Sequence, residues 1–105
     1  MKDLVVYILE STTHPNKVYT GYTGDLTKRL RQHNGLYLGG AKSTRRYRPW
    51  KVHCYVDGFE SSTEALKFEY KIKHKRKGTG ISGRIATINR ELKPHLKINY
   101  PLGDA

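Results

Sequence analysis

The residues of this sequence that could do chemistry are charged side chains at positions where a helix should be apolar. In the segment DLTKRLRQHN, residues 25–34, Leu26 and Leu30 define the apolar stripe of a predicted helix. Arg29 and His33 extend that stripe, three and seven residues after Leu26. We therefore expect an arginine and a histidine beside the buried edge of this helix, although such a histidine taken alone is typical of a hydrogen-bonded structural residue.

A second helical segment carries a carboxylate in the same kind of position. Ala65, Phe68 and Ile72 recur at the spacing of a buried helix face. Glu69 lies within that stripe, where a carboxylate is costly unless it is paired or binds a cation. Spacing alone leaves two readings open: Glu69 forms a structural ion pair with Arg29, or it belongs to a functional site.

Two tyrosines lie in neighbouring strand-like runs near the start of the sequence, Tyr7 in VVYIL and Tyr19 in VYTGYT. Arginine binds phosphate oxygens bidentately, and Mg²⁺ held by one carboxylate and several waters usually lies beside phosphates. Tyrosine is a poor base at its usual pKa of about 10, but nearby cations lower that pKa. Together with Arg29, His33 and Glu69, the tyrosines indicate phosphodiester hydrolysis, in which a phenolate near Arg29 takes a proton from water.

The distribution of charge predicts a polyanionic partner. The 105 residues carry a formal net charge of +11, and no acidic residue lies between Asp25 and Asp57. Nucleic acid fits this pattern better than a membrane, because no basic amphipathic helix has a clean apolar face. A surface that only keeps a protein soluble usually mixes both signs of charge. The predicted DNA-binding residues are Lys28, Arg31, Lys42, Ser43, Thr44, Arg45, Arg46 and Arg48.

Two further features are less decisive. The basic run KIKHKRK, residues 71–77, is either another phosphate contact or a solvated helix end. Trp50 could stack on an exposed base at a DNA junction, but its place at the start of a strand favours the core.

The single cysteine, Cys54, excludes a disulfide within the chain and a cysteine-rich zinc site. It favours a reducing compartment, the cytoplasm or the nucleus. The first residues have too short an apolar run for a secretion signal, and no stretch approaches the roughly 20 apolar residues of a membrane span.

The predicted elements follow the order β-β-α-β-α-α. Strands are predicted over residues 4–10, 18–23 and 50–59, and helices over 25–34, 61–77 and 82–92. Val52, Cys54 and Val56 are expected on one face of the third strand, and Ser61 with Glu64 fits a capping box. This order predicts an α/β (α+β) domain with a small, three-stranded, mainly antiparallel sheet flanked by helices.

One domain is expected over residues 1–105, because a chain of this length suits a single domain. Its core spans about residues 4–92. The tail, residues 93–105, is either a short extended piece or disordered.

The ordered motifs resemble those of the GIY-YIG nucleases. Val5-Val6-Tyr7 stands where the family has GIY, and Tyr19-Thr20-Gly21 where it has YIG. Three of these positions depart from the pattern, but both tyrosines and the second glycine are kept. The similarity continues through LTKRLRQHN, GGAKSTRRYRPW, GF and ALKFEY, over residues 4–92. The pieces RQHNG, GGA, RPW and ALKFE most resemble the structure-specific branch, that is, Slx-type nucleases of branched DNA and stand-alone YhbQ-like proteins.

The resemblance implies a GIY-YIG endonuclease domain that cuts branched or flapped DNA with one Mg²⁺ or Mn²⁺. Tyr7 and Tyr19 would surround the attacking water, with one of them as general base. Arg29 would stabilise the charge on the scissile phosphate, and His33 would support the tyrosines or the phosphate. Glu69 would bind the metal. DNA repair and recombination are among the roles that this branch suggests.

Several points stay open at the level of the sequence. Slx-type nucleases carry a further zinc-binding domain that docks a scaffold protein, and we do not expect these 105 residues, with one cysteine, to form it. The need for a scaffold partner is therefore undecided, as is the choice between a monomer and a weak homodimer. The alternative function is a non-catalytic basic nucleic-acid-binding module on the same scaffold. The complete set of Tyr7, Tyr19, Arg29 and Glu69 favours the enzyme.

Overall fold

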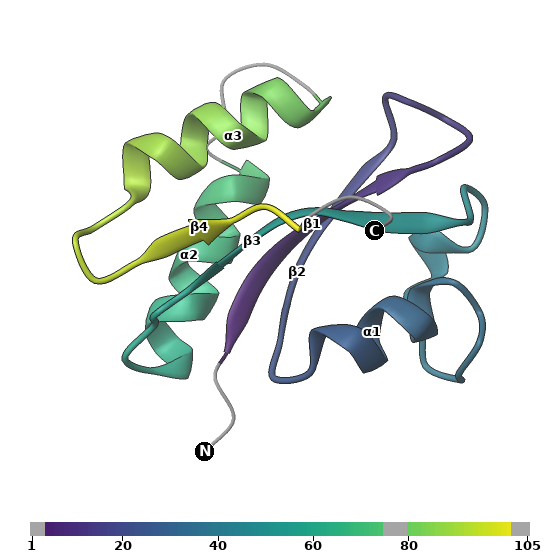
Figure 1. The fold of residues 1–105 in the computed structure, drawn as a ribbon, viewed down its shortest axis with the longest axis horizontal. Helices are drawn as coiled ribbons and strands as arrows, with labels where there is room; N and C mark the ends of the chain where they lie inside the picture. Colours follow the sequence, from purple (N-terminus) through teal and green to yellow (C-terminus); the bar gives the residue numbers. More distant parts are fainter. Residues whose placement is uncertain (1–3, 75–79, 102–105) are drawn as a thin grey trace.

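The computed structural model of the protein describes residues 4–74 and 80–101. One antiparallel sheet has the strand order β2-β1-β3-β4. Its strands are β1 (Val5–Ser11), β2 (Val18–Thr23), β3 (Trp50–Asp57) and β4 (Lys97–Asn99). The helices are α1 (Leu26–His33), α2 (Ser62–His74) and α3 (Gly80–Glu91), and a short 3-10 turn, η1, covers Lys42–Thr44. Helix α1 lies on one face of the sheet, and α2 and α3 lie on the other (Figure 1).

The predicted mixed α/β architecture, an antiparallel sheet flanked by helices, is confirmed. The sheet nevertheless has one strand more than predicted, because β4 pairs with β3 through Val56 and Ile98. Leu96, just before β4, is buried in the core. The prediction that the core ends near residue 92 was therefore too short. The apolar pattern around β4 spans three residues, too few to indicate a strand by alternation.

The helix boundaries mostly follow the sequence signals. Asp25 caps α1 by accepting a hydrogen bond from the backbone N–H of Lys28 at 3.1 Å. The capping box of α2 is confirmed in part, because Ser61 Oγ accepts from the backbone N–H of Glu64 at 3.1 Å. Helix α3 begins at Gly80, two residues before the predicted start. The helix predicted over residues 61–77 corresponds to α2, and its predicted end at Lys77 lies outside the described residues. None of the described helices has the length and apolar composition needed to cross a bilayer.

Strand β1 is buried on both faces, as predicted, and its side chains alternate between two cores. Val6 and Ile8 face α2 and α3, where they pack with Cys54, Val56, Ala65, Phe68, Ile72, Ile88 and Leu96. Tyr7 and Leu9 face α1 and pack with Trp50. Leu26 and Leu30 of α1 complete this second, smaller core.

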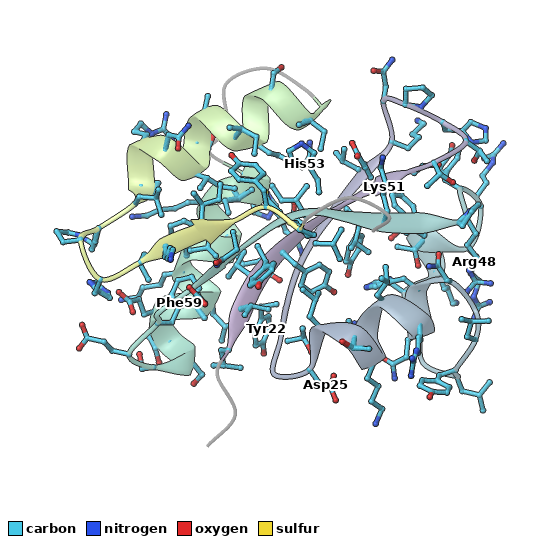
Figure 2. The ribbon with its side chains drawn as sticks, viewed as in Figure 1. Tyr22, Asp25, Arg48, Lys51, His53 and Phe59 are labelled. Carbon is cyan, nitrogen blue, oxygen red and sulfur yellow. The ribbon has the colours of Figure 1, made fainter. Side chains whose placement is uncertain are left out.

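Strand β3 changes face in its middle, which contradicts the expectation that Val52, Cys54 and Val56 share one face. Leu9 pairs with Val52 while Ile8 pairs with Cys54, so His53 is an extra residue without a partner in β1. Such a bulge reverses the alternation of side chains. Val52 consequently packs in the α1 core, and Cys54 and Val56 pack in the α2–α3 core. His53 is labelled in Figure 2.

Candidate active site

Helix α1 places Arg29 and His33 at the sheet, as its sequence predicts. Leu26 and Leu30 anchor the helix to the core around Tyr7, and this leaves Arg29 half-buried and His33 fully buried. Figure 2 labels Asp25 near the start of α1 and Arg48 in the loop beyond its other end. Arg48 Nε donates a hydrogen bond of 2.6 Å to the backbone carbonyl of His33, which closes the end of the helix over the site.

A buried chain of hydrogen bonds runs from Tyr7 through His33 to Thr44. Tyr7 Oη lies 2.9 Å from His33 Nε2, and His33 Nδ1 lies 3.0 Å from Thr44 Oγ1. Thr44 Oγ1 donates its only proton to the carbonyl of Ala41 at 2.7 Å. Thr44 must therefore accept from His33, so Nδ1 carries the imidazole proton and Nε2 accepts the proton of Tyr7.

The two titratable side chains of this hydrogen-bond chain, Tyr7 and His33, are neutral at neutral pH. Burial, together with the positive charges of Arg29 and Arg48, lowers the pKa of His33 to about 4. Burial raises the pKa of Tyr7 to about 12, although Arg29 opposes the shift. At neutral pH the site therefore contains a phenol that donates to a neutral imidazole.

The second tyrosine stands beside this chain. The Tyr19 ring centroid lies 6.3 Å from that of Tyr7 and 4.6 Å from that of His33, and Tyr19 is only partly buried. Gly21, the glycine of the second motif, leaves room for this grouping. A Cβ atom on Gly21 would lie 2.5 Å from the Tyr7 hydroxyl, so a larger residue would displace the phenol.

Arg29 joins the tyrosines to the loop that follows α1. Its Nη1 donates to the carbonyl of Gly39 at 2.8 Å and to Gln32 Oε1 at 3.0 Å. Burial alone would lower the pKa of Arg29, but Tyr7 and Tyr19 outweigh it and the pKa is raised. The guanidinium is thus a fixed positive charge next to both tyrosines, with part of its surface open to solvent.

Glu69 approaches the tyrosines from helix α2, on the other side of the sheet. Helix α2 packs against the edge strand β2. The Glu69 side chain is 15% exposed and lies 3.7 Å from Lys73 Nζ, which in turn lies 5.8 Å from the centre of the Tyr19 ring. Within the described part of the chain, Glu69 forms no ion pair with Arg29, so that structural alternative is wrong.

The chemistry of Glu69 fits a weakly held divalent cation. Among residues 4–74 and 80–101, no three His, Cys, Asp or Glu side chains gather to enclose a metal ion. A single carboxylate suits Mg²⁺, because this ion usually keeps several waters and takes its other ligands from substrate phosphates. Glu69 has the solvent access that such a site needs.

The predicted DNA-binding residues divide into an exposed group and a buried one. The exposed residues are Lys28, Arg31, Lys42, Ser43, Arg45 and Arg46. Thr44 is fully buried, so its side chain does not face the surface that the exposed cations share. The 3-10 turn η1 rotates its side chain inward to His33. Arg48 is half-buried and holds the end of α1.

Other residues support the site from behind. Trp50 is 4% exposed and its Nε1 donates to the carbonyl of Thr44 at 2.7 Å, which confirms the favoured core position. Asn34 Nδ2 donates to the carbonyl of Trp50 at 3.0 Å. On the other face, Arg84 Nε donates to Thr20 Oγ1 at 3.1 Å and brings a cation to the edge strand. The sequence pattern pointed to neither Thr44 as a partner of His33 nor Arg84, because each contact depends on how distant segments fold together.

Comparison with known proteins agrees with this geometry. A family model described as the GIY-YIG catalytic domain matches residues 4–82. The chain belongs to the GIY-YIG catalytic domain family.

Its relatives include subunits of structure-specific endonucleases. The chain is 41% identical over 98 residues to the structure-specific endonuclease subunit SLX1 of Candida dubliniensis, which covers 89% of this chain and 34% of the relative. It is 49% identical over 69 residues to the structure-specific endonuclease subunit slx1 of Schizosaccharomyces japonicus, covering 65% of this chain and 25% of the relative. The chain thus spans about a third or less of the length of these relatives.

Proposed function

We propose that the protein is a divalent-metal-dependent endonuclease that hydrolyses phosphodiester bonds in DNA and prefers branched or flapped DNA to linear duplex. The observation that carries the proposal is the convergence of Tyr7, Tyr19, His33, Arg29 and Glu69 around strands β1 and β2. The adjacent loop presents exposed cations to a phosphate backbone. The names of the relatives, structure-specific endonuclease subunits, support the preference for branched DNA.

The hydrogen-bond chain gives a proton of the attacking water a path away from the phosphate. Tyr7 would take that proton as it passes its own to Nε2 of His33. Burial, Arg29 and Arg48 disfavour the resulting imidazolium, so its charge would have to be balanced by the negative charge that develops on the phosphate. Because Thr44 fixes the proton on Nδ1, the lone pair of Nε2 always faces Tyr7. Arg29 lies beside the tyrosines, where it stabilises the negative charge that develops on the phosphate.

Glu69 would hold the metal, Mg²⁺ or Mn²⁺, with water and phosphate oxygens as the remaining ligands. A bound divalent cation supplies neutralisation of the charge on the leaving oxygen. Lys73 Nζ lies 3.7 Å from Glu69 Oε2, so a cationic side chain stands beside the carboxylate that would hold the metal.

A cleavage assay tests this function. Purified protein and the Glu69→Ala variant are incubated with labelled 5′-flap, fork, four-way-junction and linear DNA, with Mg²⁺ or with EDTA. The Glu91→Ala variant is a matched control, because Glu91 also forms ion pairs with basic side chains but lies away from the site, on α3. We expect Mg²⁺-dependent cutting by the wild type and by Glu91→Ala and none by Glu69→Ala.

The opposite result would favour the alternative function. Tight binding of every DNA without a cut would make this chain a basic nucleic-acid-binding module on a nuclease scaffold. Cutting by this chain alone would show that a scaffold partner is not required. A DNA substrate would be consistent with a protein of the cytoplasm or nucleus. Burial raises the pKa of the Cys54 thiol to about 12, which keeps this free cysteine unreactive.

A further inference from the structure

The loop after α1 exposes three consecutive apolar residues next to the site. Leu36 is 71% exposed, Tyr37 47% and Leu38 96%. Single exposed leucines are common on protein surfaces, but an exposed run of apolar residues is unfavourable and usually has a function. We call these three residues the apolar wedge.

The apolar wedge is held in place by α1. Gln32 Nε2 donates to the carbonyl of Leu38 at 3.1 Å, and Arg31 Nη1 donates to Tyr37 Oη at 3.2 Å. A Cβ atom on Gly40 would lie 2.3 Å from the Gln32 carbonyl, so only glycine lets the loop approach the helix this closely. These contacts hold the loop in a conformation in which Leu36 and Leu38 are exposed to solvent and are not packed against the core.

The position of the apolar wedge relative to the site indicates what it contacts. Arg29 donates to the carbonyl of Gly39, immediately after Leu38, and the same guanidinium lies beside Tyr7 and Tyr19. Exposed cations, Lys28 and Arg31, lie on the adjoining turns of α1. An apolar partner surrounded by negative charge fits this surface, and bases flanked by phosphates have that chemistry. Proteins that kink DNA insert Leu, Ile or Phe between base steps in this way.

We propose that Leu36 and Leu38 pack against the unstacked base pair at a DNA branch point and thereby bring the scissile phosphate to Arg29. The proposal rests on the proposed function, since it takes DNA as the substrate. Linear duplex hides its base faces in the stack, whereas a flap, fork or junction exposes one where the strands separate. The apolar wedge would therefore favour branched DNA by contact with a base face, and the cations would bind the backbone of any DNA.

Two measurements test the proposal. Cleavage rates of branched and linear DNA are compared for the wild type, for the Leu36→Ala/Leu38→Ala double variant and for Leu66→Ala. Leu66 is a matched control, because it is an exposed leucine on α2, 42% exposed and on the opposite side of the sheet. In parallel, 2-aminopurine placed next to the branch point reports unstacking by its fluorescence, with Glu69→Ala as the background and EDTA present.

We expect the double variant to lower the branched-to-linear ratio of cleavage rates by about tenfold, the scale on which small apolar contacts discriminate between substrates. The double variant should also fail to produce the fluorescence increase at the branch point. Leu38→Phe, which keeps an apolar side chain, should retain both effects, and Leu66→Ala should resemble the wild type. Linear DNA should be bound equally by all variants.

The outcomes separate the two proposals. Cutting of branched DNA with an unchanged ratio in the double variant would overturn the apolar wedge and leave the nuclease standing. Fluorescence that depends on the leucines, without cutting by the wild type, would support the apolar wedge and overturn the nuclease. If neither the ratio nor the fluorescence responds to the leucines, the surface contacts something other than DNA and the proposal is wrong.

Discussion

Between the sheet and α2 and α3, a large apolar group is buried beside the hydroxyls of Thr20 and Thr87, whereas between the sheet and α1 a buried imidazole joins a chain of hydrogen bonds. Nine buried residues from four elements, β1, β3, α2 and α3, and from the loop before β4 form the first group. The second contains only Tyr7, Leu9 and Trp50 as buried hydrophobic residues, beside the buried polar side chains of His33 and Thr44. A domain of this size buries a modest share of its surface, so the larger apolar group must supply most of the stability.

The difference separates two requirements that a small enzyme has to satisfy. Apolar packing has no preferred direction, so it stabilises the fold without fixing individual atoms within tenths of an ångström. Hydrogen bonds are directional, and the chain from Tyr7 to Thr44 fixes which atom carries each proton. Strand β1 serves both purposes, because its alternate residues face the two sides. Substitutions on the two sides should therefore affect different quantities.

The largest effect is expected for Tyr7→Phe, on the side of α1. Removal of the hydroxyl takes away the group that receives the proton of water, and general base catalysis contributes about 10²–10⁴-fold. The rate of DNA cleavage should fall by that factor. The free energy of unfolding should fall by only about 1–3 kcal/mol, the cost of leaving His33 Nε2 unpaired. Single-turnover kinetics and urea denaturation measure the two quantities, and a variant that cuts normally would exclude Tyr7 as the base.

Ile72→Ala tests the other side. Ile72 is fully buried on α2, and truncation of such a residue costs about 2–5 kcal/mol of stability through lost contacts and a cavity. Cleavage by the folded fraction at low temperature should stay near the wild-type rate. Leu66→Ala, on the exposed side of the same helix, is the control and should change the free energy of unfolding little. A large loss of rate in folded Ile72→Ala would mean that the two sides are not independent.

A pH effect of intermediate size should come from His33. Its pKa is about 4 in the folded protein and about 6.5 in the unfolded chain. Between these values the unfolded chain binds a proton that the folded protein does not. Stability contributed by neutral His33 should therefore decrease as the pH falls, by about 1.4 kcal/mol per pH unit.

Urea denaturation at pH 7, 6 and 5 compares the wild type with His33→Gln. The variant lacks the imidazole and should lose stability less steeply with falling pH. Imidazole nitrogen NMR should also show the proton of His33 on Nδ1 throughout this range. Equal slopes for the two proteins, or a proton on Nε2, would contradict the hydrogen-bond assignment.

The smallest effect is expected for Thr44→Val, which keeps the shape of the side chain and removes its hydroxyl. The carbonyl of Ala41 and Nδ1 of His33 lose their partners, at a cost of about 1–3 kcal/mol in the free energy of unfolding. The catalytic rate constant should fall while the affinity for DNA stays unchanged, because Thr44 is buried. Thr44→Ser should restore the rate. Weaker DNA binding would instead support the original prediction of a DNA contact.

The sequence predicted the apolar side well and the polar side only in part. Helical spacing located Ala65, Phe68 and Ile72 because a buried stripe repeats every three or four residues. The same spacing located Arg29 and Glu69 as exceptions to the stripe. The structure brings Arg29 to both tyrosines and places Glu69 where its charge acts on Tyr7. Helical periodicity therefore identified both the buried faces of the helices and the charged residues within those faces.

The failures concern features that no period encodes. Thr44 was grouped with the surface residues of its loop, because in GGAKSTRR every neighbour is small or polar and only the 3-10 turn decides which side chain points inward. The short extended piece that was one alternative for the tail is β4, but its place in the sheet was not predicted, because it depends on pairing with β3. The change of face within β3 depends on an unpaired residue that only the register reveals.

Because of that unpaired residue, the two halves of β3 follow opposite patterns of alternation. Trp50 and Val52 pack in the α1 core, and Cys54 and Val56 pack in the α2–α3 core. His53 is the additional residue between the two pairs. Deletion of His53 would remove a single residue, yet it would shift the frame of everything before it. Trp50 and Val52 would turn from the layer that holds Tyr7 to the opposite layer. Along this strand, evolution can exchange residues one at a time much more readily than it can remove one.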